Sequence, residues 1–202
     1  MARVSQAAFW EDLYARGGDG WELGAPAQPL IDFVETSPPP RGRVLVPGCG
    51  RGHDARFLAA RGYDVVAVDF SPAALSTARA LARRDKVGVE FEQRDIFTLG
   101  ADHARDFDGV WEYTCFCAID PARRAEYVRT IAAVLRPGGW LLACFFPLRW
   151  MTPGPPYVVS RAEIRDRLRP HFSISRELAP LHSARGRQGR EWLVHAVRTS
   201  DR

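Results

Sequence analysis

The chain has 202 residues, of which 46% are hydrophobic and 26% are charged, and its formal net charge is +4. This length suits a single domain with a sizeable core, and no stretch approaches the roughly 18 consecutive apolar residues of a membrane span. The basic residues are dispersed, and the first residues lack a signal-peptide core. We therefore expect a cytoplasmic protein with no membrane or nucleic-acid partner.

The N-terminal region predicts two helices. Apolar spacing favours a helix over 7–16, with Ser5 as its N-cap, and the glycines of 17–20 end it. A second helix is expected over 29–35, because the prolines at 38–40 cannot continue it. Both helices precede the first strand.

The next segment has the layout of a nucleoside-binding unit. An apolar strand over 43–46 leads into a turn and then into a helix over 54–61, and a second strand over 63–69 ends in Asp69. The turn holds three alternating glycines, Gly48, Gly50 and Gly52. Glycines there allow positive φ and let the backbone approach a ligand closely, and a carboxylate at Asp69 can bind ribose hydroxyls.

The glycine spacing favours one nucleoside cofactor over another. A dinucleotide fingerprint reads G-x-G-x-x-G, but here the third glycine comes one residue early and His53 takes the expected glycine position. The pattern G-x-G-x-G is typical of S-adenosylmethionine (SAM) binding. A nicotinamide-dependent oxidoreductase and a purely structural turn stay open on this pattern alone.

The remaining chain alternates between helices and strands. Apolar patterns and turn residues predict helices over 72–84, 121–135 and 160–168, and strands over 87–97, 107–113, 140–146, 172–178 and 191–198. Such alternation predicts an α/β fold with a seven-stranded, mostly parallel sheet, helices on both faces and a C-terminal antiparallel hairpin.

Several dispersed motifs narrow the family. The turn described above and Leu-Arg-Pro-Gly-Gly at 135–139 resemble class I SAM-dependent methyltransferases, which have a Rossmann-like fold. Segments 9–16, 20–24, 111–121 and 153–160 resemble the thiopurine methyltransferase-like superfamily, and 111–121 is most similar to its halide/thiol methyltransferase branch. The resemblance implies one SAM-dependent domain over 1–202, with an N-terminal helical lid (1–40) on a Rossmann-like core (41–202).

The resemblance also implies a cofactor and the residues that bind it. The cofactor would be SAM and the product S-adenosylhomocysteine. The lid would place Trp10, Tyr14 and Trp21 against the cofactor, where aromatic faces attract the sulfonium cation; by spacing alone these rings read as core. The other contacts carried over are Gly48 and Gly50 beneath the methionine part, Asp69 on the ribose, Phe70, Asp95 and Ile96 around the adenine, and Glu112 and Tyr113 facing the reacting methyl group.

The acceptor is predicted from Tyr113. The halide/thiol branch carries a Tyr-Thr pair, as seen at Tyr113-Thr114, where thiopurine enzymes carry an arginine. This implies a small, soft nucleophile, namely a thiol or thiolate, bisulfide or halide, with Tyr113 as the catalytic residue that orients it. The loop 185–190 either folds over the pocket and holds an anion or is a mobile surface loop. The segment 189–193 departs from the branch at Trp192, where lysine is usual.

Other interpretations stay open. A thiopurine-type enzyme, a tellurite or metalloid methyltransferase and a non-catalytic SAM-binding regulator share parts of the pattern. No metal site is predicted, because Cys115 and Cys117 on an extended chain would point to opposite faces. His182 is interpreted as an exposed loop residue rather than a base. We expect a small-molecule acceptor and a monomer or weak homodimer.

Overall fold

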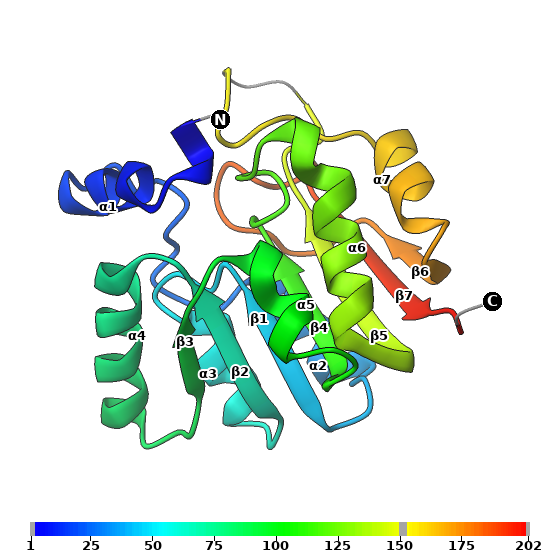
Figure 1. The fold of residues 1–202 in the computed structure, drawn as a ribbon, viewed down its shortest axis with the longest axis horizontal. Helices are drawn as coiled ribbons and strands as arrows, with labels where there is room; N and C mark the ends of the chain where they lie inside the picture. Colours follow the sequence, from blue (N-terminus) through cyan, green and yellow to red (C-terminus); the bar gives the residue numbers. More distant parts are fainter. Residues whose placement is uncertain (1–2, 150–152, 201–202) are drawn as a thin grey trace.

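The computed structural model describes residues 3–149 and 153–200 (Figure 1). The ends of the predicted domain, 1–2 and 201–202, and the start of a proline-rich loop at 151–152 lie outside the described residues. The described residues form a seven-stranded sheet with the order β3-β2-β1-β4-β5-β7-β6. The strands are β1 (Arg43–Pro47), β2 (Asp64–Asp69), β3 (Glu90–Gln93), β4 (Phe107–Tyr113), β5 (Leu135–Phe145), β6 (Phe172–Leu178) and β7 (Trp192–Arg198).

The direction of the strands follows the predicted pattern. Strands β1 to β5 are parallel, and β7 runs antiparallel to both β5 and β6. The predicted α/β fold with a mostly parallel sheet and a C-terminal hairpin is confirmed. The strand order reverses between β1 and β4, and in open α/β sheets ligands bind at the carboxyl ends of the strands beside such a reversal.

Helices cover both faces of the sheet (Figure 1). They are α1 (Ala7–Ala15), α2 (Gln28–Thr36), α3 (His53–Ala59), α4 (Pro72–Asp85), α5 (Leu99–Asp102), α6 (Arg124–Val134) and α7 (Arg161–Leu168), with 3₁₀ turns at Arg3–Ser5, Ile96–Thr98 and Pro121–Arg123. Side chains from α5, α6 and α7 share one buried cluster with one face of the sheet, and those from α2 and α3 share a second cluster with the other face. No helix of the described residues is long and apolar enough to cross a membrane.

Adjacent residues of the central strands alternate between these two clusters. Leu45 belongs to the cluster under α6, and its neighbours Val44 and Val46 belong to the cluster under α2 and α3. All three are almost fully buried. A strand buried on both faces reads as a continuous apolar run, which is why the sequence identifies it.

The structure corrects several predicted boundaries. Ser5 does not cap α1, because Gln6 occupies the N-cap position and Ser5 ends a 3₁₀ turn. Strand β3 is much shorter than the predicted 87–97, because Asp95 accepts a hydrogen bond from the Phe97 amide at 3.0 Å and starts a 3₁₀ turn. Strand β5 begins at Leu135, since this residue pairs with Phe107 before a bulge. The short helix α5 was not predicted.

Candidate cofactor and acceptor site

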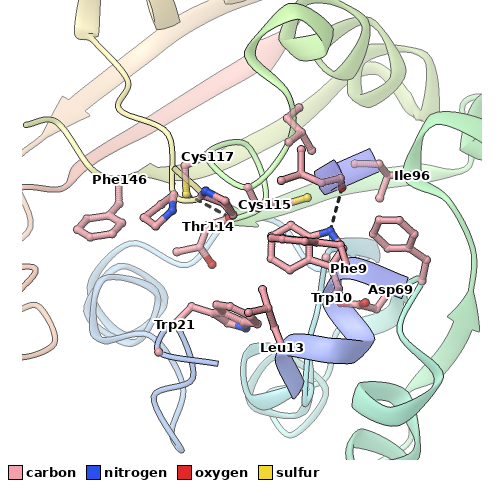
Figure 2. A pocket seen from close by; sticks show the side chains of 18 of the residues that line it. Phe9, Trp10, Leu13, Trp21, Asp69, Ile96, Thr114, Cys115, Cys117 and Phe146 are labelled. Carbon is pink, nitrogen blue, oxygen red and sulfur yellow. Dashed lines mark hydrogen bonds between the residues drawn. The ribbon is translucent and has the colours of Figure 1, made fainter. Parts of the chain in front are cut away.

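A cavity of about 660 Å³ lies at the carboxyl ends of the parallel strands, beneath α1 and the segment that follows it (Figure 2). Within the predicted lid of residues 1–40, the part over residues 7–24 is called the lid segment below. The β2–β3 end of the cavity is lined by Asp69, Phe70, Asp95 and Ile96. The β4–β5 end is lined by Thr114, Phe146 and Arg187. This volume lies within the range of small-molecule sites, roughly 300–1,000 Å³.

The glycine turn after β1 forms part of the floor. Gly48 has φ +60, and a Cβ there would lie 2.8 Å from the Cys115 Sγ. Gly50 has φ +52, and a Cβ there would lie 3.1 Å from the Tyr14 hydroxyl. Gly48 lines the large cavity, whereas Gly50 lines a smaller adjoining one. A side chain at either position would therefore clash with its neighbours. Glycine avoids this clash and leaves room for a ligand to contact the backbone of the turn.

Asp69 is held by the backbone at the end of β2. Its Oδ2 accepts a hydrogen bond from the Gly50 amide at 2.8 Å and its Oδ1 accepts one from the Ser71 amide at 2.9 Å. Burial raises the pKa of the carboxyl group, and the side chain lines the cavity. Each carboxylate oxygen has a second lone pair, so the group can also accept hydrogen bonds from ligand hydroxyls.

Asp95 both caps a turn and lines the cavity. It caps the 3₁₀ turn that begins at Ile96, as a turn-capping carboxylate would, and both residues line the cavity with Phe70. A carboxylate between two apolar side chains suits the edge and the faces of an adenine ring. The β2–β3 end therefore has the chemistry of a nucleoside site.

Aromatic rings of the lid segment cover the cavity. Trp10, Tyr14 and Trp21 all line it. The Trp21 ring contacts the rings of Trp10 and Tyr14 edge to face, with centroids 5.4 and 5.5 Å apart. The Trp21 Nε1 donates to the Tyr14 hydroxyl at 3.3 Å, and burial raises the pKa of Tyr14. The three side chains form one connected layer, which can cover a sulfonium cation with aromatic faces.

Ion pairs join the lid segment to the residues around the glycine turn. Arg51 pairs with Asp19 at 2.5 Å, and the His53 Nε2 lies 2.8 Å from a Glu22 oxygen. Glu11 also accepts a hydrogen bond from the Ser71 hydroxyl. His53, which occupies the position of a fingerprint glycine, thus contacts the lid segment. This contact gives the departure from the dinucleotide pattern a structural role.

Tyr113 lies beside the large cavity rather than in its lining. It is half-buried and lines the smaller adjoining cavity with Gly48 and Thr114, which both cavities share. Its hydroxyl donates to the Glu191 Oε1 at 2.6 Å. Burial raises the pKa of Tyr113 strongly, so the hydroxyl keeps its proton. Because this proton is donated to Glu191, the phenol oxygen can interact with a ligand only as an acceptor.

Glu112 does not face the cavity as the family resemblance implied. Neighbouring strand residues point to opposite faces, and Glu112 points into the core under α6. One of its oxygens accepts from the Phe116 amide at 2.9 Å, and the other accepts from the Tyr127 hydroxyl. Burial raises its pKa to about 7. The prediction that Glu112 faces the methyl group is corrected by this placement.

The two cysteines after β4 both line the cavity. Strand β4 ends at Tyr113, so Cys115 and Cys117 lie in a turn, and the extended chain assumed from the sequence is wrong. Burial raises the pKa of Cys117 to about 12 and that of Cys115 well above its ordinary value. Thiols that stay protonated are poor nucleophiles and metal ligands. Within the described residues, no cluster of His, Cys, Asp and Glu side chains could hold a metal ion.

The loop 185–190 folds over the β4–β5 end of the cavity. Arg185, Arg187 and Arg190 all line it, and Arg187 is only 6% exposed. His182 lies outside the cavity, exposed, with its Nδ1 2.8 Å from an Asp32 oxygen. Sequence reasoning did not single out Phe146 or Glu191. No local pattern marks either residue, since Phe146 simply follows a strand and Glu191 simply precedes one.

Comparisons with known proteins agree with this geometry. Residues 5–199 match the family model described as Thiopurine S-methyltransferase (TPMT). The chain belongs to the thiopurine S-methyltransferase family. It is 32% identical over 197 residues to Thiocyanate methyltransferase 1 of Arabidopsis thaliana, covering 96% of this chain and 86% of that protein. It is 36% identical over 156 residues to Probable thiol methyltransferase 2 of the same plant, covering 76% of this chain and 68% of that protein.

A solved structure extends the match to three dimensions. The 1,6-didemethyltoxoflavin-N1-methyltransferase of Burkholderia thailandensis, solved with S-adenosylhomocysteine bound, has a TM-score of 0.73 and 25% identity, covering 96% of this chain and 87% of that one. The predictions of the family, of the Rossmann-like fold and of a SAM-dependent methyltransferase are confirmed. The glycine turn, the carboxylate of Asp69 and the aromatic layer of the lid segment together form a site whose chemistry fits SAM.

Proposed function

We propose that this family member transfers the methyl group of SAM to a small, soft nucleophile, namely a thiol or thiolate, bisulfide or halide. The observation that carries the proposal is the β4–β5 end of the cavity, where the Phe146 ring and the Arg187 guanidinium lie under the lid segment and Tyr113 lies beside them. Similarity to proteins named thiol and thiocyanate methyltransferases supports the same class of acceptor.

The proposed reaction mainly requires the protein to align the nucleophile with the methyl group of SAM. When bound, SAM supplies a methyl group that its positively charged sulfur already activates. A thiol with an ordinary pKa of about 8.5 is a few per cent thiolate at neutral pH, so a strong base is not required. Alignment of the reacting groups can contribute roughly 7–11 kcal/mol.

Each part of the site has a proposed task. Asp69 and Asp95 bind the nucleoside, and Trp10, Tyr14 and Trp21 cover the sulfonium and exclude water. The phenol oxygen of Tyr113, fixed by the hydrogen bond to Glu191, orients the nucleophile. The proposal includes a cytoplasmic enzyme that acts as a monomer or weak homodimer, without nucleic acid or membrane.

A panel of acceptors tests the proposal. Iodide, bisulfide, thiophenol, a thiopurine and tellurite are each incubated with the protein and SAM, and release of S-adenosylhomocysteine is measured. We expect turnover with iodide, bisulfide or thiophenol to exceed turnover with the thiopurine and tellurite. SAM binding without turnover of any acceptor would instead indicate a regulator, and affinity for a nicotinamide nucleotide without affinity for SAM would reject the proposal.

A further inference from the structure

A buried guanidinium that forms no ion pair within the described residues lies at the β4–β5 end of the cavity. The Arg187 Nη2 donates to the carbonyl oxygen of Trp21 at 2.9 Å. Its Nη1 is buried and has no hydrogen-bond partner among residues 3–149 and 153–200. None of the ion pairs found between those residues includes Arg187. The side chain nevertheless lines the cavity and is 6% exposed.

The surroundings of Arg187 are aromatic. Its guanidinium carbon lies 5.1 Å from the Tyr113 ring centroid and 5.0 Å from that of Phe146. Ring faces attract a cation but do not neutralise it. Buried charges in proteins are normally paired, because a charge without a partner costs several kcal/mol to remove from water. Asp54 interacts with Arg187 only electrostatically, since its own oxygens accept from the Ala27 amide and the Trp111 indole. The unpartnered Nη1 therefore points to an anionic ligand in the cavity.

The nearby carboxylate does not supply this charge. One oxygen of Glu191 accepts the hydrogen bond from the Tyr113 hydroxyl. The other oxygen is buried and has no hydrogen-bond partner among the described residues. Glu191 therefore makes no hydrogen bond to Arg187.

Two ligand groups could provide the anion, the carboxylate of SAM and the methyl acceptor. Arg187 contacts residues at the ends of β4 and β5, whereas Asp69 marks the nucleoside position at the end of β2, on the other side of β1. We infer that Arg187 recognises the negative charge of the methyl acceptor and so selects anions over neutral molecules. This inference rests on the proposed function, because it concerns the acceptor of that reaction.

Anion binding can be measured without turnover. Thiocyanate is titrated by calorimetry into protein saturated with S-adenosylhomocysteine. We expect the wild type to bind thiocyanate and Arg187→Gln to bind it at least about tenfold more weakly, because a charge-assisted hydrogen bond is lost. The control Arg169→Gln removes the same charge from an exposed position outside the cavity and should change binding less than about fivefold.

Two further variants keep the test decisive if Arg187→Gln does not fold. Arg187→Met keeps an apolar stem that can pack on the rings of Tyr113 and Phe146, and it should lose thiocyanate binding in the same way. Arg187→Lys keeps the positive charge and should retain part of the binding. Thermal unfolding of each variant shows whether it is folded before its affinity is measured.

The ligand that supplies the anion is identified by a second titration. Methylthioadenosine lacks the carboxylate that S-adenosylhomocysteine carries. If Arg187→Gln weakens binding of S-adenosylhomocysteine about tenfold but leaves methylthioadenosine unchanged, the cofactor carboxylate is the partner and the inference is wrong. Equal thiocyanate affinity in the wild type and Arg187→Gln, or no affinity in the wild type, would also overturn it. Failure of turnover with all acceptors would reject the proposed function, which is a separate result.

Discussion

The two ends of the cavity are built in different ways. At the β2–β3 end, hydrogen bonds hold Asp69 and Asp95 to backbone amides two residues further along the chain. At the β4–β5 end, the hydrogen bond from Tyr113 to Glu191 spans 78 residues and that from Arg187 to Trp21 spans 166. One end is organised locally, and the other depends on three distant segments.

This difference separates cofactor binding from acceptor choice. A local turn keeps its geometry whenever its strand is in place, so the nucleoside end is fixed by the core of the sheet. The acceptor end requires the lid segment, β4 and the loop 185–190 to meet. Substitutions at the first end should therefore alter affinity for SAM, and substitutions at the second should alter turnover or acceptor affinity.

The largest effect is expected at Asp69. In Asp69→Ala, the Gly50 and Ser71 amides lose their acceptor and the ribose loses its carboxylate. Each bond to a charged group contributes about 1.5–3 kcal/mol, so SAM affinity should fall more than about a hundredfold. Calorimetry with SAM measures it, and Asp69→Asn serves as the matched control that keeps one acceptor oxygen. Unchanged affinity in Asp69→Ala would contradict the assignment of the β2–β3 end.

Glu112 tests the core beneath the β4–β5 end. Burial raises its pKa from 4.5 to about 7, so the folded protein holds a proton that the unfolded chain releases as the pH rises through this window. The wild type should lose up to about 3 kcal/mol of stability relative to Glu112→Gln between about pH 5 and about pH 8. Chemical unfolding of both proteins at the two pH values measures the difference. A difference that does not change with pH would show that Glu112 ionises normally.

Tyr113 separates turnover from cofactor binding. Tyr113→Phe removes the phenol oxygen while keeping the ring that packs against Trp111 and Arg187. We expect kcat to fall about tenfold, the value of one lost hydrogen bond, with SAM affinity unchanged. Steady-state rates of S-adenosylhomocysteine release measure kcat, and calorimetry measures the affinity. Equal kcat in the variant and the wild type would remove Tyr113 from the mechanism.

The smallest effect is expected at the lid segment. Trp21→Ala removes one aromatic face from the cavity, and such a face contributes about 0.5–2 kcal/mol to binding of a desolvated cation. SAM affinity should fall about fivefold, whereas affinity for the uncharged thioether S-adenosylhomocysteine should fall less. Trp21→Phe keeps a smaller face and should lie between. Equal losses for both ligands would indicate packing rather than attraction to the sulfonium.

The sequence determined the parts of this protein that depend on neighbouring residues. Buried strands read as apolar runs, alternating glycines mark a turn that approaches a ligand, and Asp69 follows from its place at a strand end. For the same reason the strand directions and the hairpin could be predicted from alternating elements. Where local capping competes with strand pairing, as at Asp95, the predicted boundary was wrong.

Only the tertiary structure decided how the β4–β5 end is assembled. An arginine in a polar loop has no periodic signal, so the sequence could not tell whether Arg187 is exposed or buried. Its burial depends on contacts with Trp21, Tyr113 and Phe146, which come from three distant segments. Such contacts form only when the whole sheet has formed, because long-range packing, rather than the local conformational preference of the loop, fixes its position.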